Sequence, residues 1–174
     1  YAGRISGGVF KKEDEVVVLP SGFHSKIKSI ITFNKEIEEA HAPMSVTLTL
    51  SNNLDISRGD MIVRENNQPK ILKEIELMVC WLGENPLSEK GKYAVKHTSN
   101  EVRGIVKEVL YKIDINTLHR NVNDLKINCN DIARITMKLS QPLLVDKYKD
   151  NRSTGSLIII DENTNNTVGA GMII

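Results

Sequence analysis

The sequence predicts an all-β protein with two strand-rich halves. Its apolar segments are short, rich in Val, Ile and Thr, and separated by turn residues, which is typical of a β-barrel or a β-sandwich. The polar stretch 64–69, which ends in Pro69, lies between two groups of such segments and has the composition of a domain linker. We therefore expect one domain at residues 1–68 and a second at residues 69–174.

Three segments of the first half have the pattern of strands. Residues 15–19 are an apolar run that ends at Pro20, and residues 45–50 alternate apolar and hydroxyl side chains, which places one face of the strand in a core. A short strand is expected at 61–63. The preceding Arg58-Gly59-Asp60 has the letters of an integrin-binding tripeptide, but we interpret this short match as a turn between strands.

The second half opens with a strictly alternating strand at residues 75–81, which places Trp81 in a core. Further strands are expected at residues 93–97, 132–139, 156–161 and 167–173. The polar run before Thr167 separates the last two, so we expect them to pair as a hairpin.

Residues 102–113 fit two interpretations. Their apolar side chains fall at the spacing of an amphipathic helix. However, Gly104 lies inside the segment and most of its apolar residues are β-branched, which favours a strand. We predict a long, bulged strand that is buried on more than one side. The Asn-rich segment 116–130 is expected to be an irregular loop with one short helical turn.

Composition limits the possible partners. With 23 Lys and Arg against 22 Asp and Glu, the net charge is +1, so no overall electrostatic attraction favours nucleic acid or an anionic membrane. The most basic short run is 147–152, with Lys138 nearby in sequence. A solvated loop is the simpler interpretation of this run, and contact with an anion or a partner chain is the alternative.

The cellular setting expected from the sequence is the cytoplasm. The two cysteines, Cys80 and Cys129, show no disulfide pattern, which favours a reducing compartment. No apolar run approaches the roughly 20 residues that cross a bilayer. We therefore expect a soluble cytoplasmic protein without a nucleic-acid or membrane partner.

The chain lacks the motifs of a nucleotide site. A phosphate-binding loop ends in Gly-Lys-Ser/Thr, whereas the one Gly-Lys pair, Gly91-Lys92, is followed by Tyr93 and lacks the upstream glycine. The segment 34–37, Asn-Lys-Glu-Ile, resembles a guanine-reading motif only faintly because Ile37 stands where Asp is required. We expect no cofactor to bind within this chain.

The side chains able to perform catalysis or bind a metal are dispersed. The histidines are far apart in sequence and lack metal-site spacing, and we expect all four at the surface or in loops: His24, His41, His97 and His119. We expect Cys80, within a strand, to be buried and inert, and Cys129 to be more exposed but without a partner that lowers its pKa. We therefore assign no catalytic, cofactor-binding or metal-binding residue.

The order of short motifs resembles the second and third domains of translation-factor-type GTPases. Residues 1–16 resemble the pattern G-R-(I/V)-x-x-G-x-(I/V/F)-K-x-G-D-x-V of the second-domain barrel, with Glu13 in place of the usual Gly. Residues 167–171, Thr-Val-Gly-Ala-Gly, are shared with elongation factor Tu. Within this superfamily, the wording of other segments resembles the GTPase (large) subunit of bacterial sulfate adenylyltransferase: residues 18–22, 31–33, 46–50, 55–61, 96–98, 111–118 and 150–156.

This resemblance implies two consecutive small β-barrels, with the first strand truncated at Tyr1 and further chain on both sides. In that enzyme a small catalytic subunit makes adenylylsulfate and pyrophosphate from ATP and sulfate, while the large subunit hydrolyses GTP. The resemblance places GTP and Mg²⁺ in a GTPase domain before Tyr1, and in some relatives an adenylylsulfate kinase domain follows. It implies a non-catalytic scaffold that contacts the GTPase domain and the small subunit, with the loop 146–155 as a candidate contact.

Two other functions compete with this one. The first is the pair of tRNA-binding barrels of an elongation-factor-like translation GTPase, which the near-neutral charge disfavours because such surfaces cluster Lys and Arg. The second is a free-standing binding module.

Overall fold

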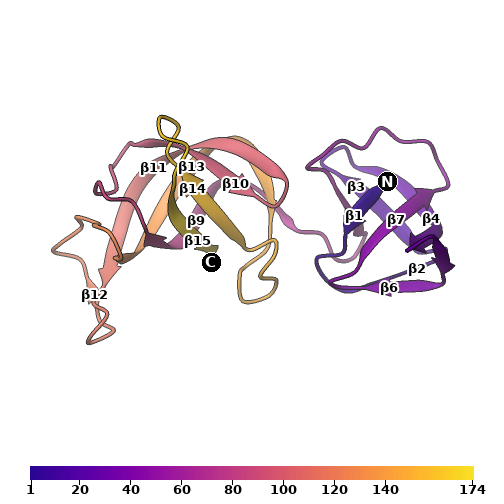
Figure 1. Cartoon of the computed structure of the whole chain (residues 1–174), viewed down its shortest axis with the longest axis horizontal. Helices are drawn as coiled ribbons and strands as arrows, with labels where there is room; N and C mark the ends of the chain where they lie inside the picture. Colours follow the sequence, from indigo (N-terminus) through magenta and orange to yellow (C-terminus); the bar gives the residue numbers. More distant parts are fainter. The chain divides into compact units, whose positions relative to one another are not determined.

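The computed structural model describes all 174 residues and contains strands but no helix, so the all-β prediction is confirmed (Figure 1). The chain divides into two compact units, residues 1–69 and residues 70–174. Each unit has a hydrophobic core of its own.

The first unit is a small barrel built from a sheet and a two-stranded ribbon. The sheet has the order β1-β7-β4-β3-β8 with β5 paired to β4, and its strands are β1 (Ala2–Arg4), β3 (Glu15–Leu19), β4 (Phe23–Thr32), β5 (Lys35–Ile37), β7 (Ser45–Leu50) and β8 (Met61–Arg64). The ribbon pairs β2 (Val9–Lys11) with β6 (Glu39–His41). The turn after β2 donates backbone hydrogen bonds to both sheets, from the Lys12 N–H to the Glu38 carbonyl before β6 and from the Glu13 N–H to the Ile27 carbonyl of β4.

The expected alternation of β7 is confirmed, because Val46, Leu48 and Leu50 are buried and the hydroxyl residues between them are exposed. The turn before β8 is also confirmed. There the Asp60 carboxylate accepts a hydrogen bond from the Ser57 N–H at 2.9 Å, and the Asp60 N–H donates to the Ser57 carbonyl.

Glu13 occupies a position that favours glycine. Its φ is +67°, a conformation that side chains with a Cβ adopt reluctantly. The neighbouring Asp14 carboxylate accepts a hydrogen bond from the Lys11 N–H at 2.8 Å, which holds the turn. The departure from the glycine of the motif therefore lies in a strained but locally supported turn.

The second unit is a closed antiparallel barrel. Its strands are β9 (Lys70–Trp81), β10 (Lys92–His97), β11 (Asn100–Ile113), β12 (Arg120–Asn121), β13 (Ile132–Val145), β14 (Ser156–Ile160) and β15 (Thr167–Ile173). The order β10-β14-β15-β9-β13-β11 becomes a ring because β10 also pairs with β11. The short β12 pairs only with the end of β11, and the β14–β15 hairpin is confirmed.

The segment 102–113 is a strand, as predicted, and its bulges explain its helical spacing. The expectation of burial on more than one side was wrong, because only the inward face is buried and Ile105 on the outer face is exposed. Two register shifts against β13 fall at Val106/Glu108 and Val109/Tyr111. Each bulge inserts a residue and changes which side chains face inward. The buried positions are therefore Gly104, Val106 and then Val109, an interval of two followed by one of three.

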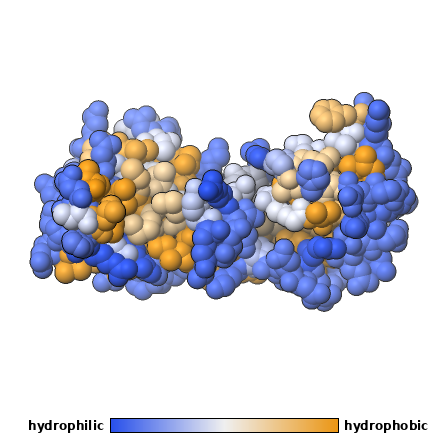
Figure 2. Space-filling view, turned by 90° about the horizontal axis from the view of Figure 1, so that it is seen from below, coloured by the Kyte–Doolittle hydropathy of each residue, from blue (hydrophilic) through white to orange (hydrophobic).

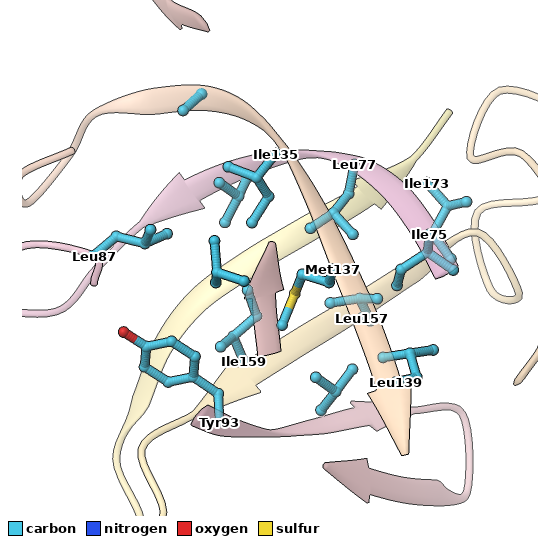
Figure 3. Close-up of a cluster of buried hydrophobic side chains, with 14 of the residues drawn as sticks. Ile75, Leu77, Leu87, Tyr93, Ile135, Met137, Leu139, Leu157, Ile159 and Ile173 are labelled. Atoms are coloured by element: carbon cyan, nitrogen blue, oxygen red, sulfur yellow. The ribbon is translucent and has the colours of Figure 1, made fainter. Parts of the chain in front are cut away.

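The interior of this barrel is filled by one cluster of apolar side chains, which converge from all the ring strands (Figure 3). Trp81 is buried as expected, with its indole N–H donating to the Asn85 carbonyl at 2.7 Å and its ring packed edge-on against Tyr93 at 5.6 Å. Gly169 and Gly171 of β15 face this interior. A Cβ on Gly171 would lie 2.8 Å from Leu77 Cδ1 and 3.0 Å from Leu157 Cδ1, so the glycines leave room for larger neighbours.

This packing predicts that Gly171→Val destabilises the chain by about 1–3 kcal/mol, because the added methyl groups overfill the core. Ala170→Val is the matched control, since Ala170 is exposed on the same strand. Urea denaturation of both variants checks this expectation. Equal stabilities for the two variants would contradict it.

Candidate functional site

The histidines do not come together, and one of them is not where we expected it. His24, His41 and His119 are exposed, as predicted, but His97 is fully buried. The expectation of a surface position was wrong because His97 shares the inward face of β10 with Tyr93 and Val95. No three His, Cys, Asp or Glu side chains in the structure are grouped so as to hold a metal ion.

The prediction for Cys80 needs a correction as well. Cys80 is half-buried, because the alternation that buries Val79 and Trp81 turns the residue between them to the outer face of the barrel. Cys129 is exposed, as expected, and its thiol lies 3.7 Å from the Leu82 carbonyl.

His97 anchors the loop between β13 and β14 from inside. Its Nε2 lies 2.7 Å from the Thr154 carbonyl, so the neutral tautomer with a proton on Nε2 fits, and Nδ1 has no partner. The Thr154 hydroxyl donates to the carboxylate of Asp146. Burial lowers the pKa of His97 below its ordinary value of 6.5, although the Thr154 carbonyl and Asp146 oppose this shift.

The loop 146–155 is held rigidly on the barrel. The Asn151 side chain accepts hydrogen bonds from the Ser153 and Thr154 N–H groups, and the Tyr148 N–H donates to the Ile173 carbonyl at 2.9 Å. Gly155 is tightly enclosed, since a Cβ there would lie 2.4 Å from the Tyr148 Cα. These contacts give the loop a fixed conformation.

The rigid loop presents three cations to solvent. Lys147, Lys149 and Arg152 are exposed, and the ion pairs of the second unit do not include them. Lys138, the other base that the sequence places near this run, lies on β13 opposite Glu74 and Ile105. The loop therefore exposes three cations together with the carboxylate of Asp150.

A second loop, at residues 114–119 between β11 and β12, was not recognised as a unit from sequence. The Asp114 carboxylate accepts hydrogen bonds from the N–H groups of Asn116 at 2.8 Å and Thr117 at 3.1 Å. These bonds hold the pKa of Asp114 below its ordinary value of 3.8. The Leu118 N–H closes the turn on the Asp114 carbonyl at 2.7 Å, and Leu118 has a φ of +58°.

The loop 161–166 between β14 and β15 repeats this conformation. The Asp161 carboxylate accepts from the N–H groups of Asn163 at 2.8 Å and Thr164 at 3.1 Å. The Asn165 N–H donates to the Asp161 carbonyl at 2.8 Å, and the φ of Asn165 is also +58°. The shared signal in the sequence is Asp-x-Asn-Thr, at 114–117 and at 161–164.

A polar network supports the segment that follows Leu118. Lys112 Nζ lies 2.8 Å from the carboxylate of Asp124 and 3.4 Å from that of Asp131. Asp124 raises the pKa of Lys112, and Lys112 in turn lowers the pKa of Asp124. Nearby, the guanidinium of Arg120 lies over the ring of Tyr111, 4.8 Å from its centroid.

The surface has no enclosed cleft. Most of the face in Figure 2 is hydrophilic, with apolar side chains gathered in patches between. In the first unit, an open hollow of about 420 Å³ is lined by residues of β1, β4 and β7 and by Phe33. Phe33 is 96% exposed at the tip of the β4–β5 hairpin, with a φ of +46°.

His97 predicts a pH dependence of stability. Its pKa is depressed in the folded state, so its contribution is complete above the unfolded value of 6.5 and is lost as the pH falls toward the folded pKa. We expect the melting temperature to fall between about pH 7 and pH 5.5, and His97→Gln to flatten this slope. Thermal denaturation across this range checks both statements. A wild-type melting temperature that is constant there would contradict them.

Curated proteins match this chain over its whole length. Bifunctional enzyme CysN/CysC of Mycobacterium tuberculosis is 45% identical over an alignment of 175 positions, which covers all of this chain and 28% of that protein. Sulfate adenylyltransferase subunit 1 is 42% identical in Alteromonas mediterranea and 41% identical in Bacteroides fragilis, where this chain covers 37% and 36% of the relative. The chain thus spans about a third of the length of the curated relatives it matches.

Solved structures share the fold at low identity. Sup35 complexed with GMPPNP has a TM-score of 0.88 at 16% identity, over 99% of this chain and 42% of the other. Translation elongation factor SelB from Methanococcus maripaludis has a TM-score of 0.76 at 20% identity, over 99% of this chain and 38% of the other. No helix in the structure is long and apolar enough to cross a membrane.

The family model described as GTP-eEF1A C-terminal domain-like matches residues 74–174. These residues include nearly all of the closed barrel, from β9 to the end of β15. The chain therefore belongs to the GTP-eEF1A C-terminal domain-like family.

Proposed function

We propose that this chain forms the two barrel domains of the GTP-hydrolysing subunit of a sulfate adenylyltransferase, which makes adenylylsulfate and pyrophosphate from ATP and sulfate. The observation that carries this proposal is identity of 41% to 45%, over both units, with proteins named sulfate adenylyltransferase subunit 1 and bifunctional enzyme CysN/CysC. Identity at this level over both barrels supports a shared role as well as a shared fold.

The proposed role of the chain is that of a scaffold that couples GTP hydrolysis to the reaction. Support for placing GTP and Mg²⁺ outside this chain is that Gly91-Lys92 lacks the phosphate-loop pattern and belongs to the turn into β10, while Asn34-Lys35 belongs to the β4–β5 hairpin. We assign both ligands to a GTPase domain elsewhere in the parent protein. The chain then contributes rigid barrels whose loops, such as 146–155, meet other parts of the enzyme.

The partners that follow are the GTPase domain and the small catalytic subunit. A fused adenylylsulfate kinase domain is a further proposed neighbour, since some relatives are named bifunctional. Both cysteines are free thiols, which agrees with a cytoplasmic location.

The competing function is that of tRNA-binding barrels in a translation GTPase. Its support is the likeness to SelB and Sup35, at 20% and 16% identity, which is a likeness of fold. A net charge of +1 disfavours it. Filter binding with aminoacyl-tRNA separates the two functions, since salt-sensitive nanomolar binding would favour translation.

The proposed activity predicts that the full-length protein containing this chain co-purifies with a small subunit. The complex should release pyrophosphate from ATP and sulfate at a rate that rises when GTP is added. A coupled pyrophosphate assay with and without GTP measures this. Absence of both the complex and the release would refute the proposal.

The proposed role also predicts that the 174-residue chain alone does not bind GTP. Calorimetric titration with GTP in the presence of Mg²⁺ checks this, and the full-length protein serves as the positive control. Micromolar binding to the isolated chain would contradict the assignment of GTP to another domain.

A further inference from the structure

The two Asp-x-Asn-Thr loops of the second unit provide an internal comparison. They share the same hydrogen bonds and the same φ at the fifth position. Over their first five residues the side chains differ at two positions, where one loop has Ile115 and Leu118 and the other has Glu162 and Asn165. Because the polar loop folds in the same way, the conformation does not require the two apolar side chains.

Leu118 is disfavoured where it lies. Its φ of +58° is left-handed, a conformation that Asn tolerates and Leu does not favour. Its side chain is exposed, so no burial of apolar surface offsets this unfavourable backbone conformation. Such local conflicts between sequence and structure concentrate at functional positions. Leu118 is therefore best explained by a contact outside the barrel.

Further apolar side chains lie close to Leu118 in the chain. Between β11 and the core residue Ile127, four of them are solvent-accessible: Ile115 is 65% exposed, Leu118 76%, Val122 61% and Leu125 37%. Figure 1 shows that β12 and its flanking loops project from the barrel. We call residues 114–126 the β12 projection.

The β12 projection is preorganised. Asp114 holds its first turn, and the Asn121 side chain accepts hydrogen bonds from the N–H groups of Asn123 at 2.9 Å and Asp124 at 3.1 Å. Lys112 Nζ binds both the Asp124 carboxylate and the Lys126 carbonyl. A rigid apolar surface loses little conformational entropy on binding, which favours its use as a docking element.

The formal charge of residues 114–126 is zero with His119 neutral, but the carboxylates are engaged within the chain and the cations remain for a partner. The carboxylate of Asp124 is paired with Lys112, and that of Asp114 accepts backbone N–H groups. Arg120 and Lys126 have no carboxylate partner among the ion pairs of the unit. The complementary surface is an apolar pocket edged by carboxylates, and two cations are too few for a nucleic-acid site.

We propose that the β12 projection docks into an apolar, carboxylate-edged pocket on the second subunit of the enzyme, with Ile115 and Leu118 as its anchors. This inference rests on the proposed function, and a second kind of subunit is implied by relatives named subunit 1. Arg120 and Lys126 lie at the rim of this proposed interface, where their charges orient the two subunits as they associate.

The test uses the full-length protein and its purified small subunit. The double variant Ile115→Glu with Leu118→Asn installs the side chains of the polar loop. Its melting temperature should equal or exceed that of the wild type, while its affinity for the small subunit falls at least about 30-fold, as expected for two anchor residues. Glu162→Ala with Asn165→Gly is the matched control, which changes the same two positions of the other loop and should retain wild-type affinity.

Hydrogen–deuterium exchange identifies what covers the projection. Several amides of 114–126 already donate hydrogen bonds, so their exchange in the full-length protein alone sets the baseline, and it should slow further when the small subunit is added. Exchange that the small subunit leaves unchanged would overturn the proposal. If the full-length protein floats with phosphatidylglycerol vesicles and the double variant does not, the proposal is overturned in favour of a membrane surface.

The outcomes distinguish the two levels of inference. If the wild type binds the small subunit and the double variant binds within twofold of it, the docking proposal fails and the proposed function stands. If the wild type does not bind the small subunit and releases no pyrophosphate, both fail. Loss of binding in the double variant alone supports both.

Discussion

The constraint on which the second unit depends is closure of its ring of strands. Pairing of β10 with β11 joins the two ends of the sheet, so every interior side chain must fit within a fixed circumference. Trp81, Leu77 and Leu157 occupy that space, and Gly169 and Gly171 make room for them from β15, the strand between β9 and β14. The Val-Gly-Ala-Gly segment is thus explained by packing and needs no role in catalysis.

The same closure fixes the positions of the loops. His97 reaches from the inward face of β10 to the Thr154 carbonyl, so the barrel interior and the basic loop 146–155 share one hydrogen bond. Bulges in β11 displace its register against β13 and lead into the β12 projection. The closed wall thus carries two dissimilar loops, each held by hydrogen bonds to the barrel or within itself.

Much of the fold could be predicted from alternation and turn residues. β7, β9 and the β14–β15 hairpin follow directly from period-two patterns. Alternation along β10 would have placed His97 inside the barrel with Tyr93 and Val95. Alternation along β9 would have placed Cys80 on the outer face. The repeated Asp-x-Asn-Thr was a usable signal for equivalent loops. The partners of Lys112 were not predictable, because they depend on how an irregular segment returns to the strand.

Closure also limits the free edges by which many sheet proteins associate. Each ring strand has a neighbour on both sides over part of its length, which leaves little edge for a partner's strand. Side chains carried by loops can be exchanged without altering the backbone beneath them. A barrel of this kind can acquire a new partner through a few substitutions while its core stays constant.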